Sequence, residues 1–183
     1  MPPASAELLP HPASACGAIR RFGASVEFAA PPDELRISFR IEGAIERLRL
    51  PGPGSALRAD SLWHHSCFEA FLRSDAGDSY HEFNFAPSGD WAAYRFASRR
   101  EGRQSPGMAA PRMEFRRAAD TFELNTAIAL ADLPDLAQAR TLQAGLTAVI
   151  EDSDGRLSYW ALAHRAAQPD FHDPGTFTLQ VMR

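Results

Sequence analysis

Lysine is absent from this chain of 183 residues, because all 19 basic side chains are arginines. A Schiff base, a lysine general base and the lysine of a phosphate-binding P-loop are therefore excluded. The absence of lysine removes these chemistries but leaves the fold open.

Cysteine, net charge and long apolar runs are also scarce. The chain has two cysteines, Cys16 and Cys67, which rules out a disulfide framework. The formal charge of −4 indicates no nucleic-acid partner, and the arginines between residues 95 and 117 fit a solvated loop. No stretch approaches 18 apolar residues, and the first 25 residues do not resemble a secretory signal. We therefore expect a cytoplasmic protein that does not contact a membrane.

The length and the hydrophobic content of 45% suffice for one well-packed core. Residues 1–12 are rich in proline and alanine and predict a loose amino-terminal segment, followed by a single domain over residues 13–183. Within that domain the apolar residues alternate with polar ones. In "LRISFRIEG", for example, Leu35, Ile37 and Phe39 share one side of a half-buried strand.

The same alternation continues along the chain and is interrupted by turn sequences. Strands are predicted at 25–30, 35–43, 66–72, 79–86, 91–97, 111–116, 121–130, 143–151, 157–164 and 176–182. "SDAGDS", "PSGD" and "DSDG" separate several of them. The only helical signal is "ADLPDLAQAR", at 131–140. This pattern predicts an all-β fold, an antiparallel β-sandwich of about ten strands.

Three neighbouring segments carry unusual outward faces. Because side chains alternate along a strand, Phe68, Ala70 and Leu72 are expected in the core. The segments are 66–72, 79–86 and 91–97. If the first of them continues toward residue 63, the faces opposite the core carry Trp63, His65, Glu69, Tyr80, Glu82, Asn84, Trp91 and Arg95. Aromatic rings beside carboxylate, amide and guanidinium groups suit a polyhydroxylated ligand, because rings pack on sugar C–H groups while polar groups bind hydroxyls.

A purely structural network is an equal alternative. Arg95 would then pair with Glu69 and Glu82 beneath a covering loop and stiffen the sheet. In either case, alternation places Glu82 and Arg95 on one face of two adjacent antiparallel strands, where opposite charges can pair.

The same residues could in principle support zinc binding, a cysteine nucleophile or glycoside hydrolysis. His65 and Cys67 could both reach a zinc ion, but a structural zinc site needs four ligands, so no metal site is expected. Cys67 lies inside a strand, where a cysteine is usually a small buried hydrophobe rather than a nucleophile. Glu69 and Glu82 could form the carboxylate pair of a glycoside hydrolase, which stays an alternative.

The carboxyl-terminal third holds a second unusual stretch, "LSYWALAHRAAQPDFHDPGTF". Its loop combines aromatic, acidic and imidazole groups, which is typical of a lid or of a packed corner. Phe171 is expected to pack, whereas Asp170 and His172 are candidates for ligand contacts.

Four blocks, "LWHHSCFEAFL", "YHEFNFAPSGDWAAYRF", "LTAVIEDSDGRLSYWALAH" and "PDFH", resemble uncharacterised bacterial proteins with a DOMON-like domain. That domain is related to the family nine carbohydrate-binding modules, and the resemblance runs from about residue 35 to the end. It implies an antiparallel β-sandwich with a ligand face on the concave sheet. The resemblance makes Trp63 and Trp91 the stacking candidates, with Glu69, Glu82, Asn84 and Arg95 as polar partners.

Relatives in this superfamily bind sugars between tryptophans, or bind haem through methionine with histidine or lysine. The haem-type methionine has no clear counterpart here, since Met108 and Met113 fall in or beside a variable loop. Most such relatives are exported, whereas this chain shows no export signal. We expect a non-enzymatic domain that binds a small saccharide without a cofactor. A haem-binding redox module and a hydrolase are the alternatives, and the sequence leaves the oligomeric state open.

Overall fold

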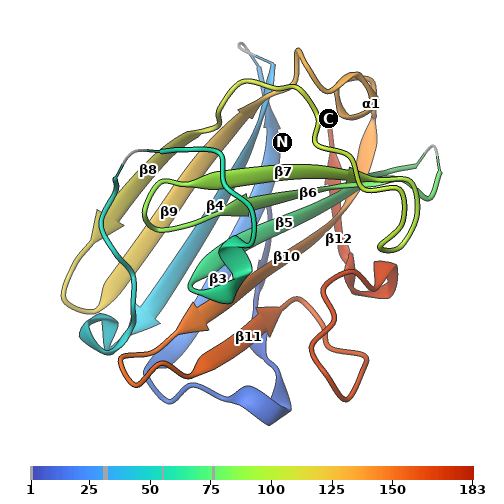
Figure 1. Ribbon diagram of the computed structural model, residues 1–183. Coiled ribbons are helices and arrows are strands. Elements are labelled where there is room, and N and C mark those ends of the chain that lie inside the picture. The colour runs from blue at the N-terminus through green and yellow to red at the C-terminus, as the bar shows by residue number, and fades with distance from the viewer. Residues whose placement is uncertain (1, 31–32, 55, 76) are drawn as a thin grey trace.

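The structure, a computed structural model, describes residues 2–30, 33–54, 56–75 and 77–183. Two layers of strands face each other (Figure 1). The five-stranded sheet has the order β1 (Ala4–Glu7), β3 (Ile19–Ala29), β4 (Glu34–Gly43), β9 (Thr121–Ala129), β8 (Arg112–Arg117). The seven-stranded sheet has the order β2 (Leu9–Pro10), β11 (Leu157–Ala161), β10 (Thr141–Glu151), β5 (Cys67–Ser74), β6 (Tyr80–Phe85), β7 (Trp91–Phe96), and β12 (Leu179–Met182) also pairs with β10. All of these strand pairs are antiparallel.

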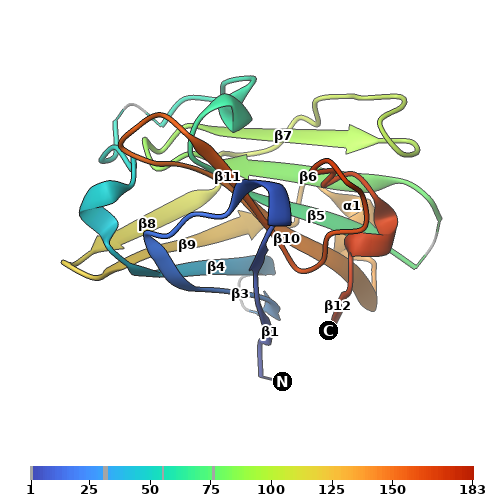
Figure 2. The same cartoon turned by 90° about the horizontal axis from the view of Figure 1, so that it is seen from below.

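In the described residues, helical structure is confined to single turns. They are α1 (Pro134–Ala137), η1 (Pro12–Ser14), η2 (Ile45–Arg47), η3 (Leu62–His64) and η4 (Pro174–Thr176), of which α1 falls in the predicted helical stretch. Within the described ranges, no helix has the length and apolar character needed to cross a membrane. Figure 2, seen at right angles, shows β5, β6 and β7 in one layer and β4, β8 and β9 in the other.

The predicted antiparallel β-sandwich is confirmed, and each of the ten expected strands is present. The two further strands lie in the segment that was expected to be loose. β1 pairs with β3, and β2 pairs with β11, so that expectation is wrong for residues 4–10. Pro10 is compatible with this position because an edge strand leaves some backbone N–H groups outside the ladder. Met1 of the expected loose segment, and Ala76 of the expected loop 74–79, lie outside the described residues.

The main core fills the space between the two sheets. The predicted inward set Phe68, Ala70 and Leu72 is confirmed, since all three are fully buried there. The Phe68 ring lies 5.2 Å from that of Phe39 and is stacked on that of Phe122 at 5.7 Å, which joins β5 to β4 and β9. Alternation in both sheets therefore supplies one continuous apolar layer.

A second apolar cluster covers the outer face of the seven-stranded sheet. It comprises Phe71, Tyr80, Ala92, Tyr94, Phe96 and Phe177, with Leu62, Trp63 and Phe171 packed against it. The absence of a side chain at Gly145 allows Phe177 to approach the sheet, because an added Cβ would lie 2.6 Å from its ring. The chain after β11 thus folds over this face and keeps much of it from solvent.

The orientation of β7 differs from the prediction. Glu82 is paired with Tyr94, and His81 with Arg95, so Tyr94 shares the face of Glu82 and Arg95 does not. The sequence could not distinguish the two orientations, because β7 is buried on both sides: Trp91 and Ala93 lie in the main core, while Tyr94 and Phe96 lie in the outer cluster.

Candidate functional site

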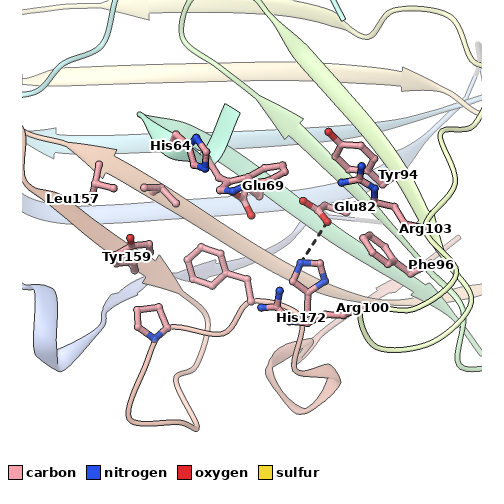
Figure 3. Close-up of a pocket in the computed structure, with 14 residues that line it drawn as sticks. His64, Glu69, Glu82, Tyr94, Phe96, Arg100, Arg103, Leu157, Tyr159 and His172 are labelled. Atoms are coloured by element: carbon pink, nitrogen blue, oxygen red, sulfur yellow. Dashed lines mark ion pairs between the residues drawn. The ribbon is translucent and has the colours of Figure 1, made fainter. Parts of the chain in front are cut away.

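A cavity of about 680 Å³ opens on the outer face of the seven-stranded sheet. Its walls come from η3, five strands of the sheet (β5, β6, β7, β10 and β11), the loop after β7 and the loop after β11 (Figure 3). The lining residues are Trp63, His64, Glu69, Glu82, Tyr94, Phe96, Arg100, Arg103, Val149, Leu157, Tyr159, Pro169, Phe171 and His172. The volume lies within the range common for small-molecule sites.

Two carboxyl groups form the floor of this cavity. Glu69 on β5 is 3% exposed and Glu82 on β6 is 4% exposed. The amide of Asn84 donates a hydrogen bond of 2.9 Å to Oε1 of Glu82. Within the part of the chain that the structure describes, Oε1 of Glu69 has no hydrogen-bond partner. A buried polar atom without a partner is uncommon and indicates a site where a ligand or water completes the hydrogen bonding.

Glu69 belongs to a row of such groups across three adjacent strands. Asn84 on β6 and Thr147 on β10 are its direct cross-strand neighbours. The Oδ1 atom of Asn84 and the Oγ1 atom of Thr147 are also buried without a hydrogen-bond partner among the described residues. The row therefore concentrates polar atoms with unused hydrogen-bonding capacity beneath one cavity.

Burial dominates the ionisation of both carboxyl groups. It raises the pKa of Glu69 well above its ordinary value, and the nearby charge of Glu82 raises it further. Burial also raises the pKa of Glu82 to about 7, although the hydrogen bond from Asn84 and the positive charges of Arg100 and Arg103 oppose the rise. Burial thus favours the neutral form of both carboxyl groups, and Glu82 is partly ionised near neutral pH.

His172 connects the carboxyl-terminal loop to this floor. Its Nε2 atom lies 3.6 Å from Oε2 of Glu82 (Figure 3). Its Nδ1 atom lies 2.7 Å from the Tyr80 hydroxyl. The backbone N–H of Arg100 donates to that hydroxyl at 3.1 Å, which leaves the hydroxyl proton free to be donated to Nδ1. We therefore assign the neutral tautomer with hydrogen on Nε2, facing Glu82. Burial, reinforced by the charge of Arg100, lowers the pKa of His172 to about 4, so the ring is neutral at pH 7.

Asp170 links the carboxyl-terminal loop that carries His172 to the loop after β7. Its carboxylate accepts hydrogen bonds from Arg99 and from Arg100, the latter at 3.0 Å, and from the backbone N–H of His172 at 3.1 Å. Burial alone would raise the pKa of Asp170, but the two arginines outweigh it and lower the pKa. Asp170 thus positions His172 from outside the cavity.

Aromatic rings form the walls. The rings of Trp63 and Tyr94 meet edge to face at 6.4 Å, and the Arg103 guanidinium lies 4.9 Å above the Tyr94 ring. On the opposite side, the Tyr159 and Phe171 rings are 6.2 Å apart. The cavity therefore offers flat apolar surfaces around a polar floor.

Four of the predicted ligand-binding residues line the cavity together: Trp63, Glu69, Glu82 and His172. Three others lie outside the lining but bond to residues in it. Tyr80 bonds to His172, Asn84 bonds to Glu82, and Asp170 bonds to Arg100. The remaining three, His65, Trp91 and Arg95, lie elsewhere.

His65 is separated from the cavity by the η3 turn. Its side chain is 79% exposed and its Nδ1 atom lies 2.8 Å from Oε2 of Glu151, in a neighbouring hollow. His64 lines the cavity instead. The alternation rule failed here because β5 begins at Cys67, and strand periodicity does not extend backward through a helical turn.

Trp91 and Arg95 follow the orientation of β7 and point away from the cavity. Trp91 is buried in the main core, with the Arg58 guanidinium 5.0 Å from its ring. Arg95 bonds to Asp135 at 3.2 Å, and His81 shares that carboxylate at 2.8 Å. The predicted pair of Glu82 and Arg95 is therefore wrong, and Trp91, a predicted stacking candidate, does not line the cavity.

Several lining residues were not predicted. Turning Trp91 and Arg95 outward implies that Tyr94 and Phe96 face the core, whereas both line the cavity. Arg100 and Arg103, expected in a solvated loop, line it as well. Tyr159 and Phe171 stood out in the sequence, but nothing local indicated which face of the sheet they cover. Tyr94 is three residues from Trp91, so the two side chains lie on opposite faces of β7, but alternation alone does not tell which face is turned outward. The hairpin pairing of Tyr94 with Glu82 decides it.

Cys67 and metal ligands can be placed as well. Cys67 is fully buried, and burial, with the charge of Glu69, raises the pKa of its thiol well above the ordinary value. Among the described residues, no group of three or more His, Cys, Asp or Glu side chains is arranged to hold a metal ion.

No model of a protein family matches this chain, and no curated protein matches it. Among solved structures it is similar to a candidate carbohydrate-binding protein from Bacteroides uniformis, with a TM-score of 0.57 and 14% identity over 96% of this chain and 85% of that one. A family 9 carbohydrate-binding module from Caldicellulosiruptor kristjanssonii, solved with cellotriose and with glucose, gives TM-scores of 0.49 at 13% and 12% identity. These matches cover 88% of this chain and 74% and 75% of the module. The first likeness shows a shared sandwich fold.

Proposed function

We propose that this protein is a binding domain for a small saccharide, held without catalysis in the cavity above Glu69 and Glu82. The observation that carries the proposal is a buried carboxyl atom without a partner, Oε1 of Glu69, on the floor of an aromatic-walled cavity. A sugar presents C–H faces to rings and hydroxyls to polar atoms, and the cavity offers both surfaces.

The sequence blocks that resemble DOMON-like proteins support the proposal. Residues 62–72, 80–96, 146–164 and 169–172 supply every lining residue except Arg100 and Arg103. Four blocks that are separate in the chain therefore meet around one cavity. The likeness to the Bacteroides uniformis protein supports a carbohydrate-binding role through the fold.

Ionisation favours binding over glycoside hydrolysis. A retaining hydrolase needs one carboxylate that is ionised and ready to attack, beside a second that is protonated. Here burial raises the pKa of Glu69 well above its ordinary value and that of Glu82 to about 7. Burial therefore disfavours an ionised nucleophile in this pair, which suits hydrogen bonding to a ligand better than nucleophilic attack.

Isothermal titration against a panel of mono- and disaccharides tests the proposal. We expect at least one sugar to bind, and Trp63→Ala to weaken it about tenfold, since one wall of rings is lost. His65→Ala is the matched control, because His65 is adjacent in sequence but outside the cavity. A panel without binding at millimolar sugar, or equal losses in both variants, contradicts the proposal.

The two alternatives are tested with the same preparation. Met108 and Met113 pack against the main core, and neither lines the cavity. A Soret band that appears on adding haemin and disappears in His172→Ala would support haem binding instead. Turnover of chromogenic glycosides that is lost in Glu82→Gln would support hydrolysis.

A further inference from the structure

The polar floor of the cavity consists mainly of hydrogen-bond acceptors. Oε1 of Glu69 and Oδ1 of Asn84 are buried without partners within the described residues, and Oε2 of Glu82 faces the cavity with His172 3.6 Å away. Thr147 adds one hydroxyl. The carbonyl oxygen of Asn84 only accepts hydrogen bonds, and each carboxyl group also becomes a pure acceptor once it has lost its proton. The group that fits this floor best is one that supplies several donors and brings no acceptor of its own.

An ammonium group meets that condition better than a hydroxyl group does. It carries three donors and no acceptor, whereas each sugar hydroxyl brings one donor together with two lone pairs that also need partners. Its positive charge also favours the ionised form of the two buried carboxyl groups, which otherwise repel each other. The ring of Tyr94 and the neighbouring ring of Trp63 add attraction for a cation.

The positive and negative groups lie at different depths in the cavity. Arg100 and Arg103 are exposed at its rim, and Arg100 is paired with Asp170. Glu69 and Glu82 are buried at its floor. The arginines are therefore screened by solvent and partly neutralised, while the carboxyl groups act at short range in a region with little water.

We propose that the ligand is a saccharide with a primary ammonium group, and that this group sits on the floor formed by Glu69, Glu82 and Asn84. This inference rests on the proposed saccharide site and names the class of sugar it selects. The rest of the sugar ring then packs between the aromatic walls, and the rim arginines contact its outer hydroxyls.

Binding of an ammonium group is coupled to release of a proton from the floor. The charged and titratable groups that face Glu82 are Glu69, Cys67, Tyr80, Tyr94, Arg100, Arg103 and His172. Of these, His172 is neutral above its pKa of about 4, and Tyr80, Tyr94 and Cys67 are held neutral because burial raises their pKa values. Glu82 is therefore the main group that changes charge as pH rises toward 7, and the affinity for an ammonium sugar should rise with it.

Calorimetric titration with glucosamine, glucose and N-acetylglucosamine tests the inference on the intact protein. We expect glucosamine to bind at least tenfold more tightly than the other two at pH 7, with the preference growing from pH 5.5 to pH 7. Repeating the titration in buffers of different ionisation enthalpy should show net release of protons with glucosamine alone.

Carboxamide variants test whether Glu69 and Glu82 cause the preference for glucosamine. Glu69→Gln and Glu82→Gln keep the side-chain shape and should reduce the preference for glucosamine to about threefold or less. Glu151→Gln is the matched control, since Glu151 is also a buried glutamate of the same sheet but lies outside the cavity, bonded to Arg49 and His65. It should retain the full preference, and thermal melts of all three variants check that they fold.

The outcomes separate this inference from the proposed function. Glucose bound as tightly as glucosamine, with no proton release, overturns the ammonium site and leaves saccharide binding standing. A preference for glucosamine that survives both carboxamide variants also overturns it. If none of the three sugars nor any other saccharide binds, the proposed function fails as well.

Discussion

Two buried glutamates, one in each sheet, differ in almost everything except burial. Glu34 on β4 is 1% exposed, and its two carboxylate oxygens accept hydrogen bonds from Arg36 at 2.7 Å and from Arg112 at 2.6 Å. Glu69 on β5 is 3% exposed, and its Oε1 atom has no partner in the described part of the chain. Burial opposes ionisation of both groups.

The pKa values of the two groups move in opposite directions. Burial tends to raise the pKa of Glu34, but the hydrogen bonds and charges of Arg36 and Arg112 outweigh it and lower the pKa. Burial and the charge of Glu82 raise the pKa of Glu69. The comparison teaches that partners, and not burial, decide what a buried carboxyl group does. Glu34 has both of its ion pairs complete, whereas Glu69 lacks a cationic partner and lies beneath a cavity.

Removing the partners of Glu34 should have the largest effect on stability. In the double variant Arg36→Ala, Arg112→Ala a buried carboxylate loses both cations, which should lower the free energy of unfolding by about 3 kcal/mol at pH 7. This value is at the low end of the free-energy cost of breaking buried ion pairs, because both guanidinium groups are more than half exposed and solvent screens them. Urea denaturation measures it, and adding Glu34→Gln should recover part of the loss. An unchanged midpoint in the double variant contradicts this account.

Glu82 should show the opposite dependence on pH. Its pKa is raised from 4.5 to about 7, so its contribution to stability is fully present below pH 4.5 and is lost as pH rises through 7. Glu82→Gln should therefore become more stable relative to wild type between pH 4.5 and pH 8, by at most roughly 3 kcal/mol, the free-energy equivalent of the rise in pKa. Thermal melts across that range measure the difference.

Glu34→Gln is the control for this pH dependence. The pKa of Glu34 is lowered, so its contribution is present above pH 4.5 and is lost only as pH falls further. The two variants should differ from wild type in opposite pH ranges. If both follow the same trend, the comparison between the two sheets does not hold.

Arg95→Ala should have a smaller effect, confined to stability. Arg95 bonds to Asp135, and the two side chains are 38% and 34% exposed, so the pair should contribute about 0.5–1 kcal/mol. His81 still contacts Asp135 in the variant. Sugar affinity should be unchanged, because Arg95 lies on the face opposite Glu82. A loss of affinity greater than threefold in a folded Arg95→Ala variant would place Arg95 near the ligand after all.

His65→Ala should change least. The side chain is largely exposed, and Glu151 keeps its bond to Arg49 at 2.8 Å without it. We expect less than about 0.5 kcal/mol in denaturant melts, and an affinity for sugars equal to that of wild type. This variant is useful because Trp63, two residues earlier, should show the opposite behaviour toward the ligand.

The alternation of apolar residues predicted most of the fold. It is a local property, since a strand turns successive side chains to opposite faces wherever it lies. Ten strands, the inward set on β5, and the outward direction of Glu69 and Glu82 all followed from it. β1 and β2 did not, because strands of four and two residues are too short for alternation to distinguish them from a loop, and their partners lie elsewhere in the chain.

The sequence by itself determined that this protein is a sandwich and that one sheet turns carboxyl and aromatic groups outward. Only the tertiary structure decided which of these groups meet. The face of β7 depended on its pairing with β6, and the covering of the floor depended on a loop about 100 residues away from Glu69 in sequence. Strand register and the covering of the sheet by a loop both depend on contacts between residues far apart in sequence. Neither can therefore be read from the alternation within a single strand. The raised pKa of Glu82 follows from the same cause, because burial by distant residues, and not the local sequence, sets it.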